Sequence, residues 1–285
     1  MCCVSCTIGW IWRATLPPRI PRVVNIAFRE PPLNVTQEVL CVLDEVLSLN
    51  GRSSAFTWRR ATAHCDGGAG TDTMQGGPGN DVYLVDHSLD VVVEHAGAGH
   101  DIVRASASFT LGGFVEDLEL TGSAAINGTG NAMQNSLRGN GAANRLDGGA
   151  GADMLAGGGG NDSYVMARGH GFDTIYENDA TPGNTDMAEF LGDISADQLW
   201  FRRLGSSLEV SVIGTADRFA VSGWYNGSAR RVEQFRSSDG KTLLDGQVQA
   251  LVDAMASFAP PPVGQTHLSD ALASQLAPVI AANWL

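Results

Sequence analysis

The chain of 285 residues carries 31 acidic and 18 basic side chains, which gives a formal net charge of −13 at pH 7. Residues 1–65 contain seven arginines and four acidic residues, so the remainder has a net charge of −16. This acidity argues against nucleic acid or an anionic membrane as partner, and no stretch of 18 apolar residues is present to predict a transmembrane helix.

The first 65 residues differ in composition from the rest. They contain all five cysteines but only two of the 35 glycines, and the cysteines show no zinc-binding spacing. One helix is predicted over residues 36–49, with Gly51 as its stop. Prolines and arginines are frequent between residues 16 and 36, which favours disorder. We therefore predict that residues 1–65 are an atypical segment, either disordered or the product of a misassigned start.

Two pairs of nine-residue repeats follow, some eighty residues apart, and each fits G-G-x-G-x-D-x-U-x, where U is a large apolar residue. The glycines suit a tight turn, and positions seven to nine form a short strand. Position eight (Met74, Tyr83, Leu155, Tyr164) points inward, so that stacked repeats bury one apolar column. The patterned turn residues are Gly67, Gly68, Gly70, Asp72, Gly76, Gly77, Gly79, Asp81, Gly148, Gly149, Gly151, Asp153, Gly157, Gly158, Gly160 and Asp162.

This pattern resembles the calcium-binding nonapeptide repeat of RTX (haemolysin-type) proteins. The resemblance implies an all-β fold, a parallel β-roll or β-helix solenoid, whose turn residues hold Ca²⁺. Calcium takes six to eight oxygen ligands, and the turns offer backbone carbonyls and carboxylates at regular spacing. A metal-free solenoid and a flexible linker are the alternatives, and the fixed aspartates and apolar eighth positions argue against the linker.

Degenerate copies surround the two strong pairs. Counting back by nine residues from Asp153 and Asp162 gives Asn135 and Asn144, whose amides bring no charge, so we predict structural coils there. Asp101 and Asp173 lie in single copies that break the period of nine, and they are either further calcium ligands or parts of strand–turn connections. The predicted calcium-binding β-roll covers residues 66–180 in two arrays, at about 66–123 and 127–180.

Aromatic alternation replaces the glycine repeat in residues 186–246. Strands are predicted over residues 199–203 and 208–213. The sequences Gly-Thr-Ala-Asp at 214–217, Trp-Tyr-Asn-Gly at 224–227 and Asp-Gly at 239–240 resemble a haemolysin-type calcium-binding-related domain. We predict that this small β-rich domain caps the solenoid.

Residues 247–285 are predicted to be helical. Val248, Leu251, Val252 and Met255 have the spacing of one helix face, and the prolines at 260–262 end that helix. Asp270 is the only charged side chain from residue 254 onward. In the family that the chain resembles, such a segment is the address read by the type I secretion machinery. A helix that only docks on the cap is the alternative.

The sequence contains neither H-E-x-x-H nor G-x-S-x-G, so we predict no enzyme within this chain, although a lost upstream domain could be catalytic. The predicted function is a secreted calcium-binding module that folds on binding calcium outside the cell and supports type I export, as the C-terminal part of a larger protein. Two alternatives remain open. One is a carbohydrate-active parallel β-helix enzyme, such as an epimerase, and the other is a surface adhesin that contacts a cell surface.

Overall fold

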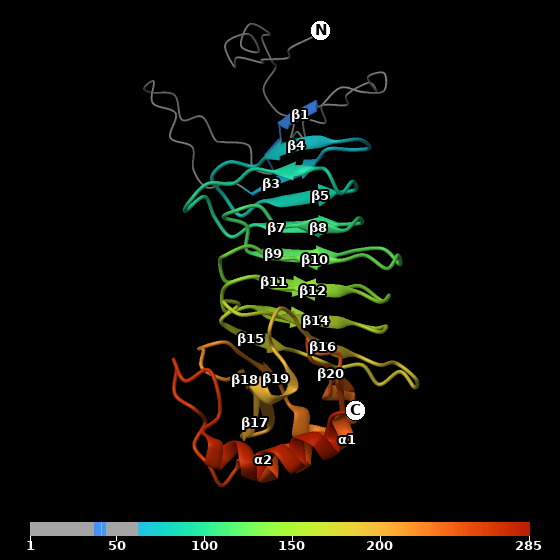
Figure 1. The fold of residues 1–285 in the computed structure, drawn as a ribbon. Coiled ribbons are helices and arrows are strands. Elements are labelled where there is room, and N and C mark those ends of the chain that lie inside the picture. The colour runs from blue at the N-terminus through green and yellow to red at the C-terminus, as the bar shows by residue number, and fades with distance from the viewer. Residues whose placement is uncertain (1–36, 41, 44–61) are drawn as a thin grey trace, which may run out of the picture.

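The computed structural model describes residues 37–40, 42–43 and 62–285 of the chain. These residues form a parallel β-solenoid of about six turns, followed by a small β-rich cap and two helices (Figure 1). The predicted fold class is confirmed. Strands alternate along the chain between two facing sides of the solenoid, so that two strands and two turns make one coil.

Eight strands of the first sheet are parallel neighbours and run the length of the solenoid. They are β3 (Ala63–Asp66), β5 (Val82–Val85), β7 (Ile102–Ala105), β9 (Asp117–Leu120), β11 (Ser136–Arg138), β13 (Met154–Ala156), β15 (Phe172–Ile175) and β19 (Arg218–Val221).

The facing strands form a second sheet and, at the N-terminal end, a smaller third one. The second sheet contains β8 (Phe109–Thr110), β10 (Gly128–Thr129), β12 (Arg145–Asp147), β14 (Ser163–Met166), β16 (Met187–Phe190) and β20 (Gln234–Arg236), with β21 (Thr242–Leu244) added antiparallel. The third sheet has the order β1 (Gln37–Leu40), β4 (Asp72–Gln75) and β6 (Val91–Val92).

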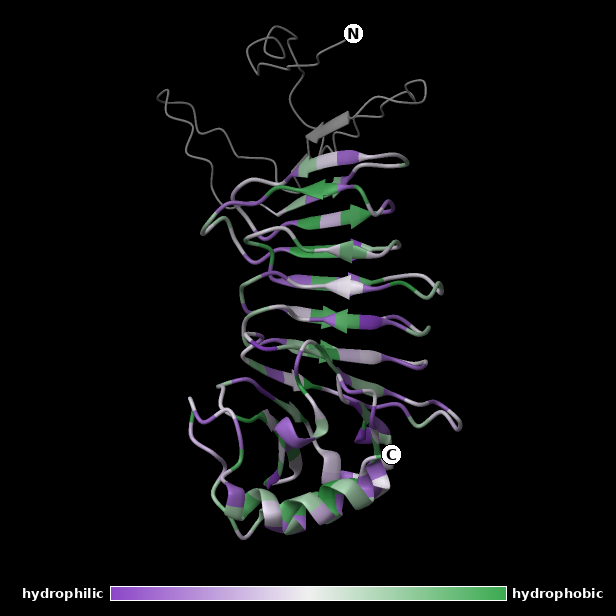
Figure 2. Cartoon of the chain, in the orientation of Figure 1, coloured by the Kyte–Doolittle hydropathy of each residue, from purple (hydrophilic) through white to green (hydrophobic). Residues whose placement is uncertain are grey.

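Strand register places the eighth residues of the repeats in columns. In the first sheet the aligned and fully buried column is Cys65, Tyr83, Val103, Leu118, Leu137, Leu155 and Ile175. In the second sheet Leu146 and Tyr164 are aligned and buried in the same way. Met74 of the third sheet is also buried. Apolar residues lie on the strands of successive coils, and polar residues are frequent in the turns (Figure 2). The predicted inward direction of position eight is confirmed.

The N-terminal end differs from the sequence prediction. The helix predicted over residues 36–49 is wrong where the structure describes this stretch, because β1 pairs with β4 and β2 (Val42–Leu43) pairs with β3. The open edges of β3 and β4 offer backbone partners, and pairing there outweighs helix propensity. The other residues of that prediction lie outside the described residues.

The solenoid also begins ahead of the predicted boundary at residue 66. Strand β3 starts at Ala63, and both Ala63 and Cys65 are fully buried in the core. Cys65 is disulfide-bonded. The remaining predictions for residues 1–61 lie almost entirely outside the part of the chain that the structure describes.

The cap continues the two main sheets. Strands β17 (Leu199–Leu204) and β18 (Ser207–Val212) form the expected hairpin, and β18 pairs antiparallel with β19, which is parallel to β15. Short 3-10 helices lie at Ala196–Gln198, Trp224–Asn226 and Ser228–Arg230. The rings of Phe190 and Phe219 stack with centroids 5.6 Å apart, and Phe219 stacks on Phe235 at 6.3 Å. This aromatic stack closes the C-terminal end of the solenoid core.

Two helices cover the cap. Helix α1 (Asp245–Met255) buries all four residues of its predicted apolar face, and helix α2 (Asp270–Asn283) buries Leu276 and Ile280. Trp284 follows α2 and packs its ring 6.3 Å from that of Phe201. Within the described residues, neither helix is long and apolar enough to cross a membrane.

Candidate metal centres

Polar residues at the turns form two rows, one along each edge of the solenoid. The first row lies where turns enter the first sheet, at the start of β5, β7, β9, β11, β13 and β15, and contains Asp81, Asp101, Glu116, Asn135, Asp153 and Asp173. The second row lies where turns leave the first sheet and contains Asp72, Asp90, Asn144, Asp162, Asp186 and Glu233.

Within each row, a carboxylate accepts a hydrogen bond from the backbone N–H of the equivalent residue one coil earlier. In the first row, the Asn135 N–H donates to Asp153 Oδ1 at 2.7 Å, and the Asp153 N–H donates to Asp173 Oδ1 at 3.0 Å. In the second row, the Asp162 N–H donates to Asp186 Oδ1 at 2.8 Å. The turns are therefore linked from coil to coil, but each carboxylate uses only one oxygen in this ladder.

The second oxygen of six aspartates is buried and has no hydrogen-bond partner among the described residues. These atoms are Oδ2 of Asp72, Asp81, Asp101, Asp153, Asp162 and Asp173. A buried carboxylate oxygen without a donor is costly, because it loses its water without compensation. A cation between the turns would supply the missing partner, and all six aspartates are among the ligands predicted from the sequence. The donor set and its unpaired oxygens therefore fit calcium.

The first glycine of each repeat makes room for this oxygen. A Cβ atom on Gly76 would lie 2.2 Å from Asp81 Oδ2, and one on Gly157 would lie 2.2 Å from Asp162 Oδ2. A Cβ atom on Gly148 would lie 2.5 Å from Asp153 Oδ2, and one on Gly67 would lie 2.8 Å from Asp72 Oδ2. The first position of the repeat is glycine because the carboxylate of its own turn occupies the side-chain space.

The second glycine brings consecutive turns together. Gly149 and Gly158 have φ of +80° and +99°, and a Cβ atom on them would lie 2.5 and 2.4 Å from the carbonyl oxygens of Asn131 and Asn140 in the preceding coil. Backbone carbonyls therefore stack beside the carboxylates, as an all-oxygen calcium site requires. The remaining predicted glycines at the second and fourth positions of the repeats also have positive φ: Gly68, Gly70, Gly77, Gly79, Gly151 and Gly160.

In the two asparagine coils the side-chain amide N–H makes a hydrogen bond at the position where the aspartates leave an oxygen unpaired. The Asn135 amide donates to the Val115 carbonyl at 2.9 Å, and the Asn144 amide donates to the Ile126 carbonyl at 2.6 Å. Each side-chain amide thus links its coil to the preceding coil through a hydrogen bond that its N–H group donates. Both side chains are buried, and neither leaves an unpaired polar atom in the described structure.

Burial raises the pKa of several of the row aspartates. Desolvation raises the pKa of Asp153 to about 6, and those of Asp101, Asp162 and Asp173 to about 7. Repulsion from Asp186 adds to the shift of Asp162. Near neutral pH the rows therefore hold carboxylates whose charged form is disfavoured until a cation compensates it.

Sequence analysis missed four members of the rows: Asp90, Glu116, Asp186 and Glu233. These four residues are identified by the register of the paired strands and not by the period of nine. The coil between Asp162 and Asp186, for example, is 24 residues long. Register also places Asp101 and Asp173 in line with the strict repeats, although their local patterns are degenerate. Both have the same buried, unpaired oxygen as Asp153.

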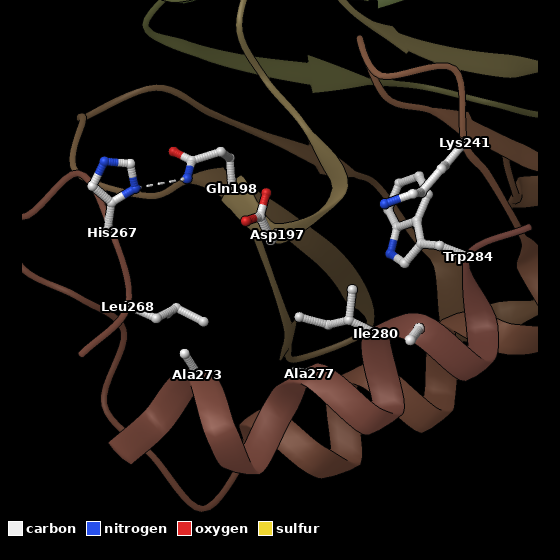
Figure 3. Close-up of a pocket in the computed structure, with 10 residues that line it drawn as sticks. Asp197, Gln198, Lys241, His267, Leu268, Ala273, Ala277, Ile280 and Trp284 are labelled. Atoms are coloured by element: carbon white, nitrogen blue, oxygen red, sulfur yellow. Dashed lines mark hydrogen bonds between the residues drawn. The ribbon is translucent and has the colours of Figure 1, made fainter. Parts of the chain in front are cut away.

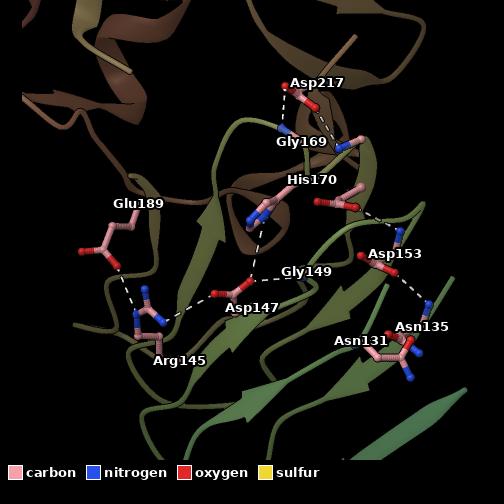
Figure 4. A network of polar contacts seen from close by, with 12 residues as sticks. Asn131, Asn135, Arg145, Asp147, Gly149, Asp153, Gly169, His170, Glu189 and Asp217 are labelled. Atoms are coloured by element: carbon pink, nitrogen blue, oxygen red, sulfur yellow. Dashed lines mark hydrogen bonds and ion pairs between the residues drawn. The ribbon is translucent and has the colours of Figure 1, made fainter. Parts of the chain in front are cut away.

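Surface contacts brace the C-terminal end of the rows (Figure 4). Asp217 of the cap accepts hydrogen bonds from the N–H groups of Gly169 and Gly171, both at 3.0 Å. Arg145 lies 3.2 Å from Glu189 and 3.8 Å from Asp147. The Asp217 contacts tie the turn before β15 to the cap, and the Arg145–Glu189 pair links β12 to β16 across β14 of the second sheet.

A pocket in the cap lies apart from both rows. Ala273, Ala277 and Ile280 of α2 form its apolar wall, and the Gln198 amide lies 3.4 Å from His267 Nδ1 at its rim (Figure 3). Asp197 and Lys241 also line it. The pocket is a gap between α2 and the β-rich part of the cap, and it contains no residue of the calcium rows.

Comparison with known families agrees with this geometry. Residues 66–83 and 129–164 match the RTX calcium-binding nonapeptide repeat family, and residues 208–246 match the haemolysin-type calcium binding protein related domain. Both strong repeat pairs lie within the matched stretches, together with the two asparagine coils.

One similar protein is the iron-regulated protein FrpA of Neisseria meningitidis serogroup C. It is 36% identical over 93 residues, which is 32% of this chain and 8% of that protein. The chain thus spans a small fraction of the length of this relative. The matched stretches are therefore similar to the RTX calcium-binding nonapeptide repeat and, after the repeats, to the haemolysin-type calcium binding protein related domain.

Proposed function

We propose that the chain is a calcium-dependent folding module in which ions bind between successive turns along both edges of the solenoid. One observation carries this proposal: six buried aspartates each leave one oxygen without a donor, at equivalent positions of stacked turns. Asp72, Asp81, Asp101, Asp153, Asp162 and Asp173 supply the charge. The patterned glycines let backbone carbonyls approach them.

Calcium binding and folding are coupled in this arrangement. The ligands of one site come from different coils, so a site exists only when the coils are stacked. Without the cation, desolvation and mutual repulsion of the carboxylates oppose stacking. Extracellular calcium modules bind with dissociation constants of about 10⁻⁴–10⁻³ M, so folding would occur in a calcium-rich medium outside the cell.

Circular dichroism of the full chain tests the coupling. The spectrum in calcium-free buffer is expected to show far less β structure than the spectrum in millimolar calcium, and magnesium at the same concentration is the control. Magnesium should substitute poorly, because it demands near-ideal octahedral geometry and releases its water reluctantly. Identical spectra with and without calcium would contradict the proposal.

We further propose that the chain is the C-terminal part of a larger secreted protein exported by type I secretion machinery. The low charge of residues 247–285 and the RTX repeats support this assignment, and the small share of the FrpA sequence that is matched is compatible with it. In the structure the same segment packs on the cap through Leu276 and Ile280, so the exported chain would use it again as a docking element.

Export is tested in a host that carries type I machinery. Removal of residues 247–285 should keep the chain inside the cell, whereas Leu276→Ala should leave export intact and lower only the stability of the exported protein. Equal amounts in the medium with and without the segment would contradict its role as an address.

A further inference from the structure

A cluster of three buried carboxylates lies beside the first row, near its N-terminal end. Asp81 and Asp101 are neighbours in that row, whereas Glu94 comes from the segment between β6 and β7, outside the strict repeats. One possible ligand atom from each side chain lies within 4.8 Å of the other two. Their exposed fractions are 0%, 0% and 6%.

The carboxylates are held in place but not neutralised. Asp81 Oδ1 accepts the Ala63 N–H at 2.7 Å, and Asp101 Oδ1 accepts the Asp81 N–H at 2.8 Å. The second oxygens of Asp81 and Asp101 are buried and unpaired. No ion pair found between described residues includes Asp81, Glu94 or Asp101. Two unpaired oxygens and three carboxyl groups therefore lie together in the interior.

Tyr83 places Glu94 at this cluster. Its hydroxyl donates to Glu94 and accepts the Gly76 N–H at 2.7 Å. A Cβ atom on Gly76 would lie 2.2 Å from Asp81 Oδ2 and 2.6 Å from the Tyr83 hydroxyl oxygen. The unpaired oxygen and the tyrosine that holds Glu94 thus face the same small space beside Gly76.

The tyrosine–glutamate pair occurs a second time. Tyr164 donates to Glu177 at 2.6 Å and accepts the Gly157 N–H at 2.9 Å. The sequence separation of the pair is 11 residues in the first case and 13 in the second. In both cases a glutamate reaches the tyrosine at position eight of the repeat, although the connecting loops differ in length. The tyrosine–glutamate pair is therefore a recurring feature of the coil and does not depend on one particular loop.

We propose that Asp81, Glu94 and Asp101 form a three-carboxylate calcium site, in which a glutamate from outside the nonapeptide supplies the third charge. The inference rests on the proposed function, because two of its ligands belong to the first row. A hard, all-oxygen donor set favours calcium over zinc or copper. Affinity rises with the number of charged ligands, so this site binds more tightly than turn sites with fewer carboxylates.

Calcium titration of the full chain, followed by calorimetry, tests this site. Glu94→Gln keeps the size of the side chain and removes its charge, so the affinity of the tightest class of ions should fall at least about tenfold. Glu119→Gln is the matched control, because Glu119 pairs with Arg104 on the surface at 3.0 Å and lies outside the cluster. It should titrate like the natural chain.

A double variant tests whether Glu94 and Asp101 share one ion. If they do, the chain with both Glu94→Gln and Asp101→Asn binds as many ions as the chain with Asp101→Asn alone. Loss of an additional ion in the double variant would overturn the shared site. The Asp101→Asn variant also keeps the test open if Glu94→Gln fails to fold, because its amide oxygen can still accept the Asp81 N–H.

Tyr83→Phe separates a calcium ligand from a structural hydrogen bond. The change removes the hydroxyl that positions Glu94 but keeps all three carboxylates, so the calcium affinity should fall by less than it does in Glu94→Gln. A loss larger than that of Glu94→Gln would overturn the proposal, since the Tyr83 hydroxyl and not the Glu94 charge would then set the affinity. If the natural chain binds calcium and Glu94→Gln binds equally well, this inference fails and the proposed function stands. If the natural chain binds no calcium, both fail.

Discussion

At the residue scale, the second side-chain polar atom distinguishes the aspartate positions of the rows from the asparagine positions. In an aspartate it is an unpaired oxygen, and in an asparagine it is a nitrogen that donates a hydrogen bond. Asp162 and Asn144 are neighbours in the second row and differ only in an oxygen that the asparagine replaces with a donor. The amide N–H of Asn144 reaches the Ile126 carbonyl, whereas Asp162 Oδ2 reaches nothing in the described structure. An aspartate at a row position therefore leaves a buried negative charge that a cation would compensate, whereas an asparagine at that position leaves none.

Asp162→Asn should therefore have opposite effects with and without calcium. In calcium-free buffer the variant should be more stable than the natural chain, because a buried charge repelled by Asp186 is gone. In saturating calcium it should be less stable, since one charged ligand is lost. Thermal melts under both conditions measure the effect. Asp193→Asn is the control, because its side chain is 77% exposed and pairs with Arg168 on the surface.

The calcium-free chain should also become more stable as the pH falls. The folded-state pKa of Asp153 is raised to about 6, and those of Asp101 and Asp162 to about 7. Groups with raised pKa bind more protons in the folded state, so their stabilisation is full below about pH 4 and is lost as the pH rises through about 7. Melts in metal-free buffer from pH 8 to pH 5 test this direction. With saturating calcium the trend should weaken, because protons compete with the ion for the same carboxylates.

At the element scale, the turn and not the strand sets the geometry. Each strand of the solenoid is short, and its register follows from how closely one turn packs on the previous one. A Cβ atom added to Gly158 would lie only 2.4 Å from the carbonyl oxygen of Asn140 in the preceding coil.

Gly158→Ala should destabilise the calcium-bound chain by about 1–3 kcal/mol more than Gly183→Ala does. Both glycines have positive φ, at +99° and +91°, but an added Cβ atom meets nothing within 4 Å at Gly183. The pair thus separates the steric cost of turn stacking from the cost of the backbone conformation. Equal losses of stability in chemical denaturation would show that the turns can move apart.

The period of nine predicted much of the fold because period and register coincide inside the strict arrays. Leu137, Leu146 and Leu155 follow from counting alone, and all three are buried. Asp90 and Asp186 could not be found in this way, since the coils that contain them have irregular length and only strand pairing aligns them. Strands β1 and β2 were missed because their pairing partners, β4 and β3, lie 20 or more residues away in the sequence.

At the scale of the whole molecule, the two ends of the solenoid are closed differently. The C-terminal end is covered by the antiparallel cap and by α1 and α2, and its core is sealed by the stacked rings of Phe219 and Phe235. At the N-terminal end, β3 is the last strand of the first sheet to pair in parallel, and β2 lies antiparallel beside it.

Truncation should show where the N-terminal end begins. Removing residues 1–64 should lower the melting temperature and raise the calcium concentration needed for folding, compared with removing residues 1–61. The longer deletion takes away Ala63, which is buried and whose N–H donates to Asp81 Oδ1. If the two truncated chains behave alike, β3 contributes nothing to the first coil.

The hydrogen bonds that the row carboxylates accept from backbone N–H groups all point the same way. The donor lies one coil earlier than the carboxylate, as in Asn135 to Asp153 to Asp173, and Asp217 of the cap accepts in the same direction from the turn before β15. The carboxylate hydrogen bonds therefore give the solenoid a direction, from the cap toward the N-terminus. We expect the coil next to the cap to become ordered first, because the cap presents acceptors to its turn and each ordered coil then presents acceptors to the coil before it in the sequence.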